Sequence, residues 1–159
     1  MEKSRLLEAI LAALQGELAL QTEAAQTSRD EATDEESRSE DKYDMRGQLA
    51  AYVAAGQAKM AGEIAEALAA YRALSSRVFV PTEPIATGAL VTLEARGRQA
   101  VYFLGPVRGG LELTIDNTAV TVITAASPLG RQLAGKRVGD FVMLPGRPTP
   151  VAHRIMAVA

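Results

Sequence analysis

The stretch QTSRDEATDEESRSEDKYD, residues 26–44, is a strongly acidic break between two apolar stripes, and it decides the fold. The stripe before it repeats every four residues, at Leu6, Ile10, Leu14 and Leu18. The stripe after it mostly follows spacings of four, seven and three, at Leu49, Val53, Met60, Ile64, Leu68 and Tyr71. These spacings are typical of a coiled-coil seam. The sequence therefore predicts an antiparallel helical hairpin with the acidic break at its tip.

The tip is placed by the midpoint of the two arms, which falls near Arg38. At about 1.5 Å per residue, arms of roughly 30 residues hold the tip about 45 Å from the base. Ser37 followed by Glu40 fits a capping box, so we expect the second helix to start near Arg38. Thr33 with Glu36 forms a competing box a few residues earlier.

Carboxylates crowd residues 30–44, where only Arg38 and Lys42 oppose them. They are Asp30, Glu31, Asp34, Glu35, Glu36, Glu40, Asp41 and Asp44. A solvated loop with helix-capping acids explains part of this pattern. However, Asp30 and Glu31 fall near the expected end of the first helix, where the helix dipole disfavours negative charge. A carboxylate cluster on a thin probe can instead hold Mg²⁺, which is usually bound by one or two carboxylates.

The composition changes near Ser75, where Pro81 and Pro84 mark a linker. Residues 1–76 carry a net charge of −6 and residues 77–159 a net charge of +4. We therefore expect two modules, a hairpin over 1–76 and a small sheet-rich domain over 77–159, giving an α+β protein. The expected strands are 78–80, 89–95, 99–104, 111–115, 119–124, 139–144 and 153–158, with a short helix over 129–134.

Several classes of site are excluded or disfavoured by composition. The chain has no cysteine, which excludes both disulfides and thiolate metal sites. Aromatic residues make up only 4% of it, which disfavours stacking on nucleic-acid bases. No apolar run approaches the roughly 20 residues that span a membrane, and the start does not resemble a secretory signal, so we expect a cytoplasmic protein. His153, the only histidine, is expected to have a structural or surface role, and Gly109-Gly110 is expected to form a hairpin turn.

Two segments carry a family resemblance. The first is ESRSEDKY, residues 36–43, and the second is VITAASPLGRQLAGK, residues 122–136, continued by Val138-Gly139-Asp140. In the second segment Ser127 can cap a short helix that Gly135 closes. With these segments, its length and its module order, the sequence resembles the GreA/GreB family of transcript-cleavage factors over nearly the whole chain.

The resemblance implies a coiled-coil hairpin that enters the secondary channel of RNA polymerase and an FKBP-like C-terminal domain that docks at the channel entrance. Tip carboxylates of such factors help to hold a catalytic Mg²⁺ and stimulate cleavage of backtracked RNA. The residues matched to the donated tip acids are Asp34, Glu35, Glu36, Glu40 and Asp41. Glu40 and Asp41 would contact Mg²⁺ only within the polymerase complex, and no cofactor would be bound by the factor alone. The matched docking residues are Ser127, Pro128, Leu129 and Gly130.

The family tip often reads Gly-Asp-Leu-x-Glu-Asn-Ala-Glu-Tyr. Glu40 and Asp41 look similar to its Glu-Asn, and Tyr43 to its Tyr, with one residue fewer between them. The leading Gly-Asp-Leu is missing, so its Asp has no unique match here. Some relatives keep the fold and dock in the same channel but inhibit transcription, and this departure favours that alternative.

In either case the polymerase breaks the bond, so the chain itself is not expected to be an enzyme. A prolyl isomerase or chaperone is disfavoured, because the C-terminal module has only Phe79, Tyr102, Phe103 and Phe141 to build an aromatic pocket. A monomer is expected, since an intramolecular hairpin buries its own seam, although a coiled-coil oligomer is an alternative. Basic residues of the C-terminal module could contact acidic polymerase surface or nascent RNA: Arg77, Arg96, Arg98, Arg108, Arg131, Lys136, Arg137, Arg147 and Arg154.

Overall fold

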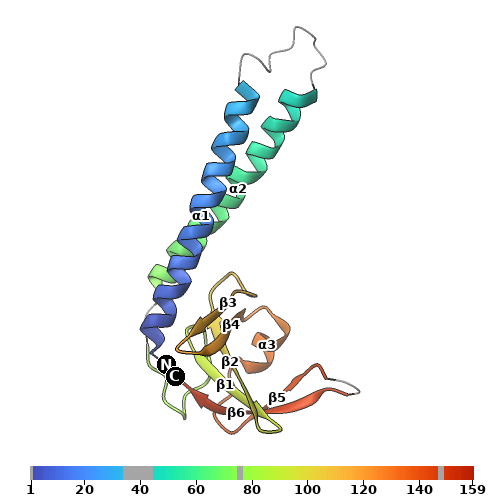
Figure 1. Cartoon of the computed structure of the whole chain (residues 1–159). Helices are drawn as coiled ribbons and strands as arrows, with labels where there is room; N and C mark the ends of the chain where they lie inside the picture. The colour runs from blue at the N-terminus through green and yellow to red at the C-terminus, as the bar shows by residue number, and fades with distance from the viewer. Residues whose placement is uncertain (1, 34–44, 75–76, 147–148) are drawn as a thin grey trace. The chain divides into compact units, whose positions relative to one another are not determined.

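The structure is a computed structural model that describes residues 2–33, 45–74, 77–146 and 149–159 (Figure 1). The chain divides into two compact units. The helical unit is Leu11–Ala69, and the sheet unit combines Met1–Ile10 with Ala70–Ala159. The predicted division of the sequence near residue 76 stays a prediction.

Helices α1, Lys3–Thr33, and α2, Met45–Ala73, run antiparallel to each other (Figure 1). Both are rich in Ala, Leu, Glu and Gln, which are strong helix formers. Thr33 is the last residue of α1, and its hydroxyl donates to the carbonyls of Arg29 and Asp30 at 3.1 and 3.2 Å. The competing capping box at Thr33 is therefore wrong. The Ser37–Glu40 box lies outside the described residues.

The predicted seam holds near the base of the hairpin and fails further out. Leu14 and Ile64 are each 1% exposed, and Leu68 is also buried, as predicted. By contrast, the exposed fractions of three predicted seam residues are high: Leu49 63%, Val53 41% and Met60 47%. These three residues were wrongly assigned to the seam.

Small and polar side chains take the place of those three residues. Ala54 is buried, and Gln57 and Ala61 are half-buried, at spacings of three and four that lead to Ile64. The Ser28 hydroxyl donates to Oε1 of Gln57 at 3.0 Å and so links the two helices directly. In the outer part of the hairpin, the large apolar residues of α2 therefore face solvent.

In the described residues, one mixed sheet has the strand order β3-β4-β2-β1-β6-β5. Its strands are β1 Leu90–Ala95, β2 Arg98–Gly105, β3 Glu112–Ile115, β4 Thr118–Thr124, β5 Phe141–Leu144 and β6 Val151–Val158. Strands β2 and β4 pair in parallel, and the other neighbours pair antiparallel. A short helix, α3, covers Pro128–Leu133. The predicted α+β class is confirmed.

Two local predictions are wrong. Residues 78–80 form no strand, because the N–H of Val80 is bound instead by the Glu83 carboxylate at 3.0 Å. Gly109-Gly110 is a turn but not a hairpin turn, because β2 pairs with β4 rather than with β3. The tight β3–β4 hairpin turns at Asp116 and Asn117, whose φ angles of 49° and 61° suit a type I′ turn.

The core of the sheet unit lies on the side of the sheet that α3 covers. Alternate strand residues such as Leu93, Leu104 and Ile155 are buried there, together with Leu133 of α3 and Phe79 of the linker. Alternation along the strands puts a second set of buried residues on the opposite face: Leu90, Phe103, Val120 and Val122.

Tyr71 is packed against the end of β2. Its hydroxyl donates to the carbonyl of Val107 at 2.8 Å, and its ring is buried. A Cβ on Gly105 would lie 2.3 Å from the Tyr71 hydroxyl and 3.0 Å from a Val122 methyl group. Glycine at 105 is therefore required by the close approach of Tyr71. Burial raises the pKa of Tyr71 to about 12, against the opposing charge of Arg108.

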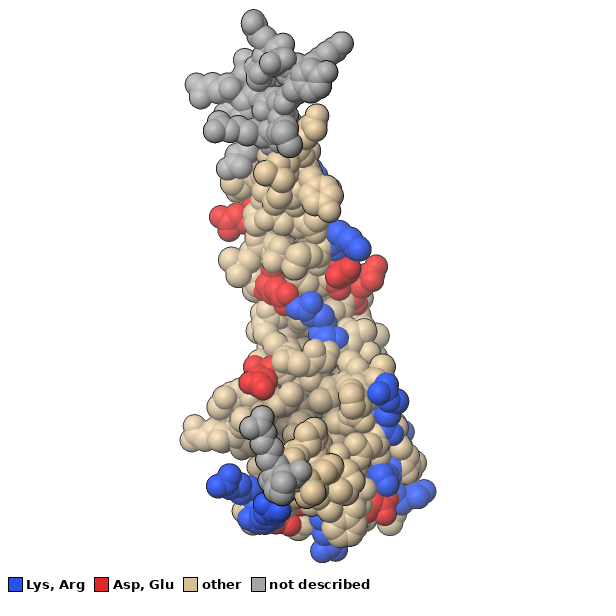
Figure 2. All heavy atoms as spheres, turned by 90° about the vertical axis from the view of Figure 1, so that its right-hand side faces the viewer, with Lys and Arg blue, Asp and Glu red and all other residues tan. Residues whose placement is uncertain are grey.

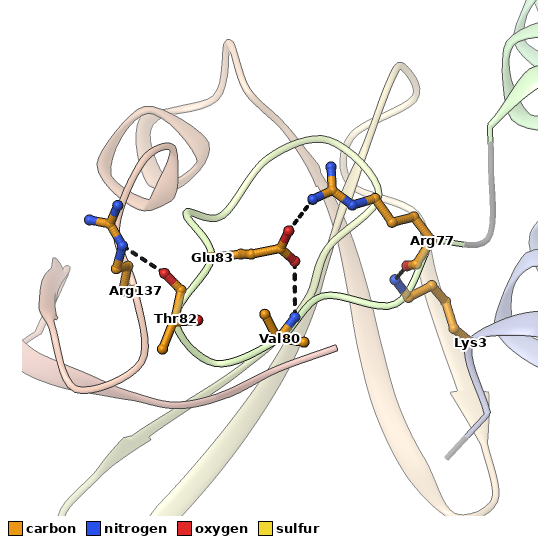
Figure 3. Close-up of polar contacts among 6 residues, drawn as sticks. All are labelled: Lys3, Arg77, Val80, Thr82, Glu83 and Arg137. Atoms are coloured by element: carbon orange, nitrogen blue, oxygen red, sulfur yellow. Dashed lines mark hydrogen bonds and ion pairs between the residues drawn. The ribbon is translucent and has the colours of Figure 1, made fainter.

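The linker after α2 is held by a cluster of charged side chains (Figure 3). Lys3 donates to the carbonyl of Arg77, and both cations lie over the Phe79 ring, 4.9 and 5.0 Å from its centroid. Such cation–π contacts help to hold the ring in place. Burial, and secondarily the charge of Arg77, lower the pKa of Lys3.

Glu83 closes the linker turn. Its carboxylate accepts from the N–H of Val80 and pairs with Arg77 (Figure 3). The backbone hydrogen bond is the largest cause of the lowered pKa of Glu83; burial opposes it and Arg77 adds to it. Arg137 donates from Nε to the Thr82 carbonyl at 2.9 Å and ties the same turn to the segment after α3.

Candidate functional site

The matched tip acids Asp34, Glu35, Glu36, Glu40 and Asp41 all lie outside the described residues. Their roles stay predictions, and so does the assignment of Mg²⁺ to Glu40 and Asp41. Near them, in the last turn of α1, the Asp30 carboxylate accepts from the Gln26 amide at 2.6 Å. The last turn of α1 holds no basic residue to offset that charge.

The predicted docking segment begins with a capped helix. Ser127 is the N-cap of α3, with φ −67° and ψ 157°, and its Oγ accepts from the N–H of Gly130 at 3.0 Å. The same hydroxyl donates to the Thr124 carbonyl at 2.8 Å. Pro128 occupies the first turn, where its missing N–H removes no helical hydrogen bond. The predicted capping role of Ser127 is confirmed.

Gly130 is fixed by space rather than by backbone freedom. A Cβ at this position would lie 1.8 Å from the Thr124 carbonyl oxygen, so no side chain fits without moving β4 or α3. Gly135 follows the C-cap residue Ala134 with φ +80°, in the left-handed region that favours glycine. The predicted role of Gly135 in closing the helix is confirmed.

Gln132 connects α3 to the edge strand β5. Its Nε2 donates to the Met143 carbonyl at 2.9 Å, and its Oε1 accepts from the Met143 N–H at 2.8 Å. These are the two hydrogen bonds that a neighbouring strand would make with Met143. The side chain therefore fixes the distance between α3 and β5. It also occupies the backbone hydrogen-bonding groups of Met143, which another strand could otherwise pair with at this exposed sheet edge.

Between α3 and β5 lies an open hollow of about 620 Å³, here called the apolar hollow. Its lining residues are Ile123, Ser127, Pro128, Leu129, Gln132, Met143, Leu144, Pro145, Gly146 and Pro150. Ser127, Pro128 and Leu129 of the predicted docking set therefore line one surface, whereas Gly130 is buried behind it. A hollow of this kind can take an apolar side chain of a partner.

Sequence reasoning missed the wall of the hollow that β5 and the following residues supply. Met143, which is 47% exposed, and Leu144 come from β5, and Pro145 follows directly. The run Phe141-Val142-Met143-Leu144-Pro145 is a signal that could have found it, because proline and exposed apolar residues together mark a sheet edge open to a partner.

Among the described residues, no group of three or more His, Asp or Glu side chains is placed to hold a metal ion. His153 lies in β6 as predicted, with Nδ1 3.0 Å from the Val151 carbonyl.

No helix in the described ranges is long and apolar enough to cross a membrane. In Figure 2, most visible Lys and Arg side chains lie over the sheet unit, in agreement with its positive charge.

Fold and site together define an α+β protein in which a long helical hairpin accompanies a mixed-sheet unit with an apolar surface hollow. Its structural neighbours are Gfh1 and GreA/GreB factors, whose family the sequence motifs resemble. GreA factor homolog 1 (Gfh1) of Thermus thermophilus is 21% identical, with 94% of each chain covered and a TM-score of 0.37. Thermus aquaticus Gfh1 is 24% identical, with 95% of this chain and 92% of that chain covered and a TM-score of 0.38.

The prokaryotic transcription elongation factor GreA/GreB from Nitrosomonas europaea is 18% identical, with 65% of this chain and 78% of that chain covered and a TM-score of 0.39. No protein-family model matches the chain, and no curated protein matches its sequence. These low TM-scores and identities describe a distant likeness.

Proposed function

We propose that this chain is a transcription elongation factor that binds RNA polymerase, inserts its acidic hairpin tip into the secondary channel and stimulates cleavage of backtracked RNA. The observation that carries the proposal is the capped α3, which presents Pro128 and Leu129 on the apolar hollow. This is the segment whose sequence resembles the docking motif of Gre factors. The same chain carries eight carboxylates within residues 30–44.

Docking and chemistry fall to different parts of the chain. The apolar hollow binds the polymerase near the channel, which holds the factor in place. The tip acids Glu40 and Asp41, with one of Asp34, Glu35 and Glu36, help to hold Mg²⁺ in the polymerase. Mg²⁺ held there would supply Lewis acidity and water activation for phosphodiester hydrolysis. Since the polymerase breaks the bond, the factor is not itself an enzyme.

Transcript cleavage in stalled elongation complexes tests the chemical part. Wild-type protein is expected to shorten the backtracked RNA, and the double variant Glu40→Ala plus Asp41→Ala to lose this effect. The matched control Glu63→Ala plus Glu66→Ala removes the same charge from exposed positions on α2 and should keep the activity. If wild-type protein gives no more cleavage than polymerase alone, the cleavage proposal fails.

Co-purification with core polymerase tests the docking part. Leu129→Glu puts a charge into the apolar hollow and is expected to weaken binding at least tenfold. Val78→Glu adds the same charge at a linker residue that is 75% exposed and should bind as wild type does. Equal binding by both variants would remove the apolar hollow from the docking surface.

A second candidate function is favoured by the tip sequence. The spacing between Glu40-Asp41 and Tyr43 is one residue shorter than the family pattern, and Gly-Asp-Leu is missing. A factor that docks in the channel without placing its acids correctly would inhibit the polymerase. Slower elongation in the presence of the wild-type chain, with no RNA cleavage, would favour this inhibitor over the cleavage factor.

A further inference from the structure

The sheet unit carries a second hollow of about 450 Å³, here called the arginine hollow. Its lining residues are Ala95, Arg96, Arg98, Val151 and His153. Arg96 lies in the turn between β1 and β2, and Arg98 pairs with Ala95 at the start of β2. Val151 and His153 come from the first half of β6, which pairs with β1. Three strands thus bring two guanidinium groups and an imidazole to one surface.

The positive charge of this hollow exceeds the negative charge beside it, because the β1–β2 hairpin carries Arg96 and Arg98 but one carboxylate, Glu94. The described ion pairs lie elsewhere, at Arg5–Asp116 and Arg77–Glu83. Glu94, the carboxylate of the same hairpin, accepts from the N–H of Gly97 at 2.7 Å and so closes the turn. A surface that gathers more cations than carboxylates attracts anionic ligands.

Arg96 stands at a backbone position that suits other residues better. Its φ is 54°, and the following Gly97 has φ 74°, the pattern of a type I′ hairpin turn. Asparagine or glycine is favoured at the first of these positions, since most side chains are strained there. Turn stability alone therefore does not select arginine, and its guanidinium is the group that the turn presents to the hollow.

The arginine hollow adjoins the apolar hollow in the β5–β6 ladder. Leu144, which lines the apolar hollow, pairs with Val151, which lines the arginine hollow. None of the residues that line the arginine hollow is a large aromatic on which a base could stack, which disfavours single-stranded nucleic acid. Guanidinium groups bind carboxylates through paired hydrogen bonds. A polypeptide can present carboxylates to the arginine hollow and an apolar side chain to the neighbouring apolar hollow.

We propose that the arginine hollow binds the carboxylates of an acidic polypeptide segment of the docking partner, which places an apolar side chain in the adjoining apolar hollow. This inference rests on the proposed docking function and specifies the chemistry of the docked surface. Arg96 and Arg98 supply the charge, and Leu129 supplies the apolar contact. Binding should weaken with added salt, because exposed charge pairs are screened.

The test adds the peptide Glu-Glu-Leu-Glu-Glu to the full chain at low salt. Binding is measured from the amide chemical shifts of the protein in NMR spectra. We expect shifts at residues 95–98 and 151–153 in the wild-type protein. Arg96→Asn plus Arg98→Gln should weaken the peptide roughly tenfold, as expected for two exposed charge pairs. Because asparagine suits a positive φ, this variant keeps the turn. Lys59→Gln plus Arg72→Gln removes the same charge from α2 and should change binding less than twofold.

Two results would overturn the inference. One is equal peptide binding by the Arg96 and Arg98 double variant and the wild type. The other is an oligouridylate, or inorganic phosphate, that binds the same residues more tightly than the peptide does, which would make the ligand a phosphate.

Polymerase binding separates this inference from the proposed function. If the peptide binds as expected but no variant or wild-type chain binds polymerase, the docking function fails and the acidic-peptide site stands. If polymerase binding requires Leu129 but is unchanged by the Arg96 and Arg98 double variant, docking stands and the arginine hollow is excluded from it.

Discussion

Tyr71 is the residue whose environment makes the most direct stability prediction. Its ring is buried, and its hydroxyl donates a hydrogen bond, 2.8 Å long, to the Val107 carbonyl. Tyr71→Phe keeps the ring but leaves that carbonyl without its donor. We expect a loss of about 1 kcal/mol in the free energy of unfolding at pH 8. Urea unfolding measures it, with Tyr52→Phe, at a residue that is 80% exposed, as the control.

The raised pKa of Tyr71 adds a pH signature. The folded protein keeps the Tyr71 proton up to about pH 12, whereas the unfolded chain releases it near 10.0. The unfolded state therefore binds fewer protons between these values, and stability falls as pH rises through that window. The stability of Tyr71→Phe should fall less steeply than that of wild type between pH 9 and about pH 11. Parallel slopes would contradict this assignment.

Glu83 acts in the opposite pH range. Its pKa is lowered from 4.5 by the Val80 N–H and by Arg77, so the folded state favours the carboxylate. The resulting stability is present above pH 4.5 and is lost as pH falls through the lowered pKa. Glu83→Gln should be less stable than wild type near pH 7 and should lose less stability on acidification to about pH 3. Urea midpoints at both pH values measure this, with exposed Glu8→Gln as the control.

At the scale of elements, two glycines in helices give opposite predictions for the same substitution. Gly130→Ala would place a Cβ 1.8 Å from the Thr124 carbonyl oxygen and push α3 away from β4. Gly16→Ala in α1 meets no atom within 4 Å. We expect the first to lower the free energy of unfolding by about 3 kcal/mol and the second to raise it by about 0.5–1 kcal/mol. Thermal unfolding of both variants checks the signs.

The seam of the hairpin makes a second prediction at this scale. Ile64 is buried, so Ile64→Ala should cost about 2–5 kcal/mol. Leu49 and Val53 are exposed, so Leu49→Gln and Val53→Gln should each change stability by only about 0.5 kcal/mol. Thermal unfolding followed at a helix-sensitive wavelength compares them. A large loss of stability in the two glutamine variants would instead support the seam that the sequence predicted.

The contrast between α2 and α3 shows where sequence reasoning works. For α3, Ser127, Pro128 and Gly135 act locally through caps and backbone angles, so short-range patterns identified them. For α2, Leu49 and Val53 fit a heptad frame, but the structure packs the alternative frame through Ala54 and Gln57. Apolar spacing alone does not choose between two frames when one is built from alanine, because alanine suits both seam and surface.

The site divides in the same way. Pro128 and Leu129 were found because they belong to a contiguous motif, whereas Met143 and Pro145 are brought to the apolar hollow by the sheet and by Gln132. Arg96 and His153 are 57 residues apart in sequence and meet only because β1 pairs with β6. Contacts made by strand pairing over long distances are what a single sequence does not reveal.

At the scale of the whole molecule, charge is separated along the chain. Residues 1–76 carry a net −6 and residues 77–159 a net +4. In the proposed function this separation matches two tasks, because the basic sheet unit binds an acidic protein surface while the acidic tip approaches a metal. Salt should weaken docking through the first task and leave cleavage within an assembled complex less affected.

If docking and chemistry are carried by different parts of the chain, a chain that lacks only its tip acids should still bind the polymerase. Glu40→Ala plus Asp41→Ala should therefore compete with the wild-type chain, so that an equal concentration roughly halves the cleavage rate when polymerase is limiting. Adding Leu129→Glu to that variant removes the apolar contact and should abolish the competition. Cleavage assays with mixed proteins measure both effects. If the variant without tip acids fails to compete although it is folded, the tip is part of the docking surface and the two tasks are not separate.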